Sequence, residues 1–151
     1  MYPIVLLLHS WNCWLVLGAA AFALPRAYRS WLTGKPFTTA DDRAGGLLVG
    51  ALDLQLLLLG MWLYFDLSAL VQAARPDWGA ALRNPTLRFW SVEHIALMLT
   101  GIVVAYAGRA LSKRAGRAAA QRHQLTALFF AVAIGLVLLG VPFALRPWFR
   151  F

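Results

Sequence analysis

The stretch IVLLLHSWNCWLVLGAAAFAL, residues 4–24, decides the fold of this chain. It holds no Lys, Arg, Asp or Glu, and a helix of about 20 mostly apolar residues is long enough to cross a bilayer. Residues 46–65, 89–108 and 125–145 have the same apolar character. The sequence therefore predicts an all-α integral membrane protein. We expect one transmembrane domain over residues 1–151, folded as an up-down four-helix bundle.

The composition agrees with a protein surrounded by lipid. Hydrophobic residues make up 61% of the chain, charged residues 13%, and the mean hydropathy is +0.66. A soluble domain is typically about half apolar and about a quarter charged. The sequence contains no phosphate loop, no nucleotide-binding glycine fingerprint and no Ser-His-Asp set, which are motifs of soluble enzymes. The lipid bilayer is the first partner that the sequence predicts.

The net charge of +8 is explained by topology rather than by nucleic acid, which we do not expect as a partner. Nine of the fourteen basic residues lie in the two connections between spans 1 and 2 and between spans 3 and 4: Arg26, Arg29, Lys35, Arg43, Arg109, Lys113, Arg114, Arg117 and Arg122. Cytoplasmic loops are enriched in Lys and Arg. We therefore expect both connections in the cytoplasm and both termini outside.

The outer connection, residues 66–88, contains its own helix signals. Residues 67–74 favour a short helix at the membrane interface. Asn84 followed by Pro85 is typical of a helix start, with Asn as the N-cap and Pro at the first helical position.

Two histidines occur at matching depths on spans 1 and 3. His9 and His94 each lie about five residues inside the outer end of their span, which is about 8 Å at a rise of about 1.5 Å per residue. Spans 1 and 3 are diagonal neighbours in an up-down bundle, so the two imidazoles should face each other across its centre. Gly60 and Gly140 lie at the same level on spans 2 and 4, where small residues leave room for a flat cofactor. This pattern predicts a haem iron held by both histidines.

Arginines near the outer end of the bundle fit the same hypothesis. Arg88 and Arg146 lie on the side opposite to most of the basic residues. A guanidinium pairs well with carboxylates, and haem carries two propionates. Arg88 and Arg146 are therefore candidates for propionates or for lipid headgroups, and Glu93 could instead orient Arg88.

Two other interpretations of the histidines stay open. Either imidazole could simply form a hydrogen bond to a neighbouring helix, and glycines are common where membrane helices pack closely. Alternatively, His9 and Cys13 are four residues apart on one helical face and could bind a metal ion, with Glu93 or His94 as a further ligand. Thiolate with imidazole suits copper(I) or zinc.

Asp53 is the second unusual residue because it lies near the middle of span 2. An ionisable group at that depth is costly and is often functional. It is a candidate for handling a proton or for a quinone site, or it forms a structural hydrogen bond, with Thr100 as the expected partner. His123, near the start of span 4, is expected among the cytoplasmic headgroups with Arg122.

Short strings along the chain resemble a group of small four-span bacterial membrane proteins that are described as cytochrome-b-like. The strings are HSW at 9–11, DLQL at 53–56 running on to Gly60 and Tyr64-Phe65, and LRFWSVEH at 87–94. The resemblance implies haem b, electron transfer and a bacterial inner membrane, with His9 and His94 as the ligands. The chain departs from diheme b-type cytochromes in having histidines for one haem level only, so electron transfer across the membrane is not implied.

The hypothesis is therefore a small b-type cytochrome or cytochrome-like subunit with one haem near the outer face, exchanging electrons with quinone or a respiratory complex. The alternative is an accessory or assembly subunit without catalysis, whose polar residues bind the helices of a partner.

The predicted topology can be tested with reporter fusions. Alkaline phosphatase fused after Phe151 should be active, because the charge distribution places that end outside. A reporter that works only in the cytoplasm should be silent at Phe151 and active within residues 113–118. The reverse pattern would contradict the predicted orientation.

Overall fold

The computed structural model describes residues 1–142, and within them the chain is a bundle of helices. Four helices are long and apolar enough to cross a membrane: Tyr2–Leu32, Thr39–Leu67, Pro85–Ser112 and Ala119–Gly140. The prediction of an all-α four-helix bundle is confirmed. The helices extend beyond the predicted spans at most ends, except that the fourth ends at Gly140. The predicted last residue of that span, 145, lies outside the described residues.

The four long helices consist of regular and irregular segments. The first is α1 (Tyr2–Leu32) and the fourth is α7 (Ala119–Gly140). The second is α2 (Thr39–Asp53) followed by the π-helical segments η1 (Leu54–Gly60) and η2 (Leu63–Leu67). The third is α5 (Pro85–Arg88), the π-helical segment η3 (Phe89–Glu93) and α6 (His94–Ser112). The outer connection holds α3 (Ala69–Ala74) and α4 (Trp78–Arg83), which confirms the short helix predicted there.

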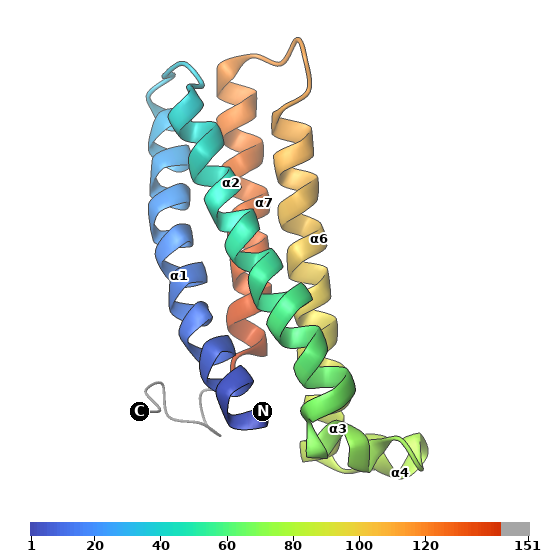
Figure 1. Ribbon diagram of the computed structural model, residues 1–151. Helices are drawn as coiled ribbons and strands as arrows, with labels where there is room; N and C mark the ends of the chain where they lie inside the picture. The colour runs from blue at the N-terminus through green and yellow to red at the C-terminus, as the bar shows by residue number, and fades with distance from the viewer. Residues whose placement is uncertain (143–151) are drawn as a thin grey trace.

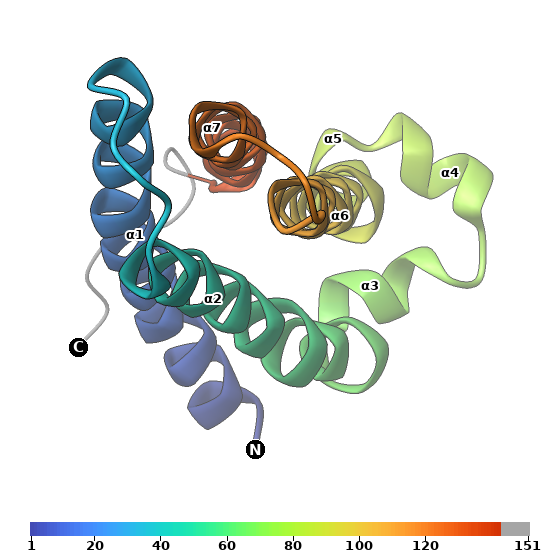
Figure 2. The ribbon, with the colours of Figure 1, turned by 90° about the horizontal axis from the view of Figure 1, so that it is seen from above.

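The helices run up and down in chain order (Figure 1). α1 lies beside α2 and α7, and α6 lies beside α7 and, less closely, beside α2 (Figure 2). α1 and α6 are therefore diagonal neighbours, as the sequence predicted. The N-terminus lies at the same end of the bundle as α3, α4 and the end of α7 (Figure 1).

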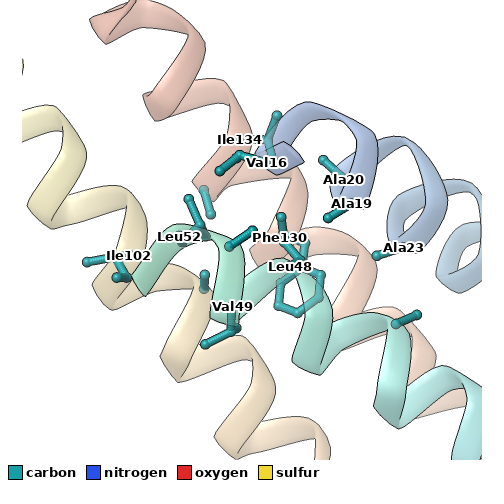
Figure 3. Packing of buried hydrophobic residues seen from close by; sticks show 14 of the residues in the cluster. Val16, Ala19, Ala20, Ala23, Leu48, Val49, Leu52, Ile102, Phe130 and Ile134 are labelled. Atoms are coloured by element: carbon teal, nitrogen blue, oxygen red, sulfur yellow. The ribbon is translucent and has the colours of Figure 1, made fainter. Parts of the chain in front are cut away.

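The core is built from small side chains on α1 facing larger ones on α2 and α7. Ala19, Ala20 and Ala23 pack against a cluster that includes Leu48 and Phe130, both fully buried (Figure 3). Lipid tails are as apolar as leucine, so helices in a bilayer associate mainly through close van der Waals contact. The alanines allow that close approach between α1 and its neighbours α2 and α7.

Glycines fit α6 tightly against α7. A β-carbon at Gly101 would lie 3.2 Å from the carbonyl oxygen of Ala133. A β-carbon at Gly108 would overlap the Cβ of Phe129. Gly101 and Gly108 are seven residues apart and so lie on one stripe of α6, which is its contact surface with α7.

Three stretches of backbone depart from α-helical hydrogen bonding. The N–H of Met61 donates to the Leu56 carbonyl, that of Ser68 to Leu63, and that of His94 to Phe89, each five residues back. Such π-turns are often found at functional sites. All three lie in the half of the second and third long helices that is nearer to α3.

Ion pairs and helix caps fix the ends of the bundle. The side chain of Asn84 accepts from the N–H groups of Thr86 and Leu87, which confirms the predicted N-cap. At the opposite end the Arg26 Nε lies 2.6 Å from Asp41 Oδ1. Arg109 and Lys113 both reach Asp42 Oδ1 at 3.1 Å, which ties α6 to α2.

His123 does not lie among headgroups, so that prediction was wrong. Its side chain is fully buried, 5.0 Å from the Phe37 ring between ring centres. The Arg122 guanidinium covers the Phe37 ring at 3.8 Å. Phe37, in the connection between α1 and α2, folds over the imidazole, a long-range contact that the local sequence did not indicate.

The tight packing of α6 on α7 predicts a large penalty for one methyl group. Gly108→Ala should lower the free energy of unfolding by about 1–3 kcal/mol, because the new methyl overlaps Phe129. Gly135→Ala is the matched control, since nothing lies within 4 Å of its new Cβ, and it should gain up to about 1 kcal/mol from helix propensity. Unfolding by sodium dodecyl sulfate, followed by circular dichroism, measures both. Equal stability of the two variants would refute this account of the interface.

Candidate functional site

A cavity of about 460 Å³ lies in the half of the bundle nearer the N-terminus. Its walls come from α1, α6, α7 and all three π-helical segments, and they are mostly apolar. The polar lining residues that matter below are His9, Cys13, Gln55, Tyr64 and His94. Pockets for small molecules and cofactors commonly enclose about 300–1,000 Å³ with mainly apolar walls and few polar groups. The cavity therefore suits a largely apolar ligand.

His9 and His94 meet across this cavity. Their ring centres are 6.5 Å apart and the ring planes are inclined by 60°. An ion bound by one nitrogen of each ring at about 2.0 Å would put the ring centres about 6 Å apart. The observed separation fits an iron held by both imidazoles, so the two predicted ligands lie together at a suitable spacing.

The tautomer of His94 is set by the end of α7. Its Nδ1 lies 2.8 Å from the carbonyl oxygen of Gly140, which can only accept, so Nδ1 carries the proton and Nε2 the lone pair. That carbonyl has no partner within α7 because the helix ends there, where Val141 is extended before Pro142. Histidines that bind metal usually donate their other N–H in this way. Gly140 therefore contributes its carbonyl to the site. The prediction that it leaves room for a cofactor was wrong, because Leu97 and Met98 of α6 fill the space where its side chain would lie.

Gly60 lies directly beside His9. A β-carbon there would be 3.7 Å from His9 Cε1 and 2.9 Å from the carbonyl oxygen of Gln55, five residues back. The second contact is a result of the π-turn in η1, which brings that carbonyl against the Gly60 position. Glycine is therefore needed for the backbone of η1, and its missing side chain also leaves space in the cavity.

Gln55 was not identified as a site residue from the sequence, yet it connects α1 to η1. Its Oε1 accepts from Asn12 Nδ2 at 2.8 Å, and its Nε2 donates to Cys13 Sγ at 3.0 Å. Asn12 also donates to the Ala51 carbonyl at 3.0 Å. Asn12 and Gln55 are both buried. This network holds α1, and with it His9, in register with the second long helix.

Tyr64 performs a similar task between the second and third long helices. Its hydroxyl donates to the carbonyl of Ser91 at 2.7 Å. Ser91 lies in η3, one turn before His94. The hydrogen bond therefore fixes the segment that delivers His94 to the cavity.

The predicted arginines lie outside the cavity walls or outside the described residues. Arg88 Nε forms a 2.6 Å ion pair with Glu93 Oε1, and both side chains are more than 40% exposed. The expectation that Glu93 orients Arg88 is confirmed by this ion pair. Arg146 lies beyond residue 142, outside the part that the structure describes.

Asp53 does not line the cavity either. Its two carboxylate oxygens lie 2.8 Å and 2.7 Å from the hydroxyl of Tyr106 on α6. The predicted partner Thr100 was wrong, because its hydroxyl donates to the Ala96 carbonyl of its own helix. The π-turns that follow Asp53 shift the helical face, so Gln55 points inward and Asp53 does not.

The alternative metal site is not assembled in residues 1–142. Within that range no group of three or more His, Cys, Asp or Glu side chains is close enough to hold a metal ion. Cys13 instead accepts its hydrogen bond from Gln55.

Comparisons with protein families, curated proteins and solved structures found nothing that matches this chain.

The Asn12–Gln55 contact predicts a specific loss of stability. Asn12→Leu should lower the free energy of unfolding by about 1–3 kcal/mol, because it leaves the buried Gln55 oxygen without its donor. Ser10→Ala, two residues away, removes only a hydroxyl that donates to its own helix, and should change stability by less than about 0.5 kcal/mol. Detergent unfolding titrations compare the two. If they are equally stable, the network does not hold α1 in place.

Proposed function

We propose that this multi-pass membrane protein is a small b-type cytochrome in which His9 and His94 are the axial ligands of one haem b. The observation that supports the proposal best is the 6.5 Å spacing of the two imidazole rings across a mostly apolar cavity. A haem held in this way supplies one-electron transfer when it is bound.

The protein's own residues prepare the site. Gly140 fixes the ring orientation and tautomer of His94 through its carbonyl. The Asn12–Gln55 and Tyr64–Ser91 hydrogen bonds hold the helices that bring the two histidines together. The apolar walls exclude water, which strengthens every electrostatic interaction inside.

The proposed location is a bacterial inner membrane, with the histidine end of the bundle facing outside. The basic connections at the opposite end support this orientation. One haem level near the outer face suits electron exchange with quinone, or with a membrane complex, from that side.

The second candidate function is that of an accessory or assembly subunit. It is favoured by the Asp53–Tyr106 pair, which lies apart from the cavity on the face formed by α2 and α6.

The visible spectrum tests the haem proposal. Protein purified in mild detergent from haem-replete cells should show a Soret band and, after reduction, a sharp α-band. His9→Ala and His94→Ala should each lose the low-spin spectrum, since one axial ligand is gone. Added imidazole should restore it in His94→Gly, because the small ligand can fill the vacated position.

His123→Ala is the control histidine variant, because His123 does not line the cavity. The His123→Ala protein that elutes from size-exclusion chromatography as a folded, monodisperse species should keep the low-spin spectrum. A colourless wild-type protein would contradict the cytochrome proposal and leave the accessory function as the better one.

A further inference from the structure

One polar pair faces outward from the middle of the bundle. Asp53 lies at the centre of the Thr39–Leu67 helix, and both of its carboxylate oxygens contact the Tyr106 hydroxyl. The exposed fraction of Tyr106 is 46%, and Asp53 is only partly buried. The pair therefore lies on the outer surface between α2 and α6.

The surroundings of this pair are apolar. One or two turns away on the same helices lie Leu57, Leu99 and Val103, with exposed fractions of 55%, 42% and 63%. Such a surface faces hydrocarbon in a membrane. Ionisable groups are rare at that depth unless they face the interior of a bundle, a cavity or a charged partner. The Tyr106 hydroxyl carries no positive charge, and among the described residues no Lys or Arg pairs with Asp53, so an ionised Asp53 has no counter-charge on this face.

The missing group must come from another chain. No Lys or Arg occurs within residues 4–24, 46–65, 89–108 or 125–142. Neither this chain nor a second copy can therefore place a cation at the depth of Asp53 from these segments. A cation at that depth requires a different protein.

We propose that the α2–α6 face, centred on Asp53 and Tyr106, docks a transmembrane helix of another protein that carries a Lys or Arg at mid-membrane depth. Opposite charges attract strongly in a medium of low dielectric constant, and the Tyr106 hydroxyl holds the carboxylate in place for the incoming cation. The shape of the face agrees with the proposal. Gly50, one turn from Asp53, is exposed, and a β-carbon at this position would have no neighbour within 4 Å. A second helix can therefore approach the backbone there.

The inference does not rest on haem binding, and a model helix in lipid vesicles tests it. The full chain, with a donor fluorophore at its N-terminus, is reconstituted with an acceptor-labelled Leu/Ala helix bearing one central Lys. The matched probe carries Leu at that position. Energy transfer should report an apparent Kd about tenfold lower for the Lys helix, as expected for one unscreened ion pair.

Variants at Asp53 test whether its carboxylate causes the preference for the Lys helix. Asp53→Leu should abolish the preference for the Lys helix, and Asp53→Glu should restore it. Asp66 has an exposed carboxylate near the end of the same long helix. The control variant Asp66→Asn should therefore leave the preference for the Lys helix unchanged. Equal affinity for both probes, or a preference that survives Asp53→Leu, would overturn the proposal. It would also be overturned if the chain alone dimerised through this face, with Asp53→Leu returning it to a monomer.

Discussion

Backbone hydrogen bonding inside lipid is the constraint on which this structure depends, because hydrocarbon offers no partner to an N–H or C=O group. Where the helices are regular, the backbone satisfies itself. Near the π-turns and at the end of α7, side chains donate hydrogen bonds to backbone carbonyls instead. Asn12 donates to Ala51, Tyr64 to Ser91 and His94 to Gly140. The irregular backbone and the polar side chains therefore belong to one arrangement, and the cavity lies at its centre.

The same constraint explains how a bundle of only four long helices can hold a cavity. Away from the cavity, the bundle is filled by alanines and leucines in close contact, together with Phe130. Around the cavity, the π-turns widen the second and third helices, and Gly60 lacks the side chain that would close the space beside His9. The cross-helix hydrogen bonds hold the widened helices in place. The cavity is thus a consequence of backbone geometry rather than of loose packing.

The two unusual polar positions have opposite surroundings. His9 and His94 face each other inside the bundle, where hydrogen bonding and apolar walls prepare them for a ligand. Asp53 and Tyr106 lie on the exposed surface of the bundle, where no Lys or Arg within residues 1–142 pairs with Asp53. One chain could therefore hold a cofactor in its interior and bind a partner helix at its periphery, with different residues responsible for each.

The sequence by itself determined the four spans, their up-down order and the matched depth of the two histidines, because hydrophobic length and residue counting along a helix are local properties. It also identified Asn84 as a helix cap and Gly60 and Gly140 at the level of the site. The tertiary structure alone decided which residues face the cavity. Regular helical spacing groups Asp53 with Gly60 and Tyr64, but five-residue hydrogen bonds after Asp53 shift the face and bring Gln55 inward. Phe37 over His123 and Tyr106 on Asp53 are likewise contacts between distant segments. Such contacts depend on how whole helices pack, which no local pattern records.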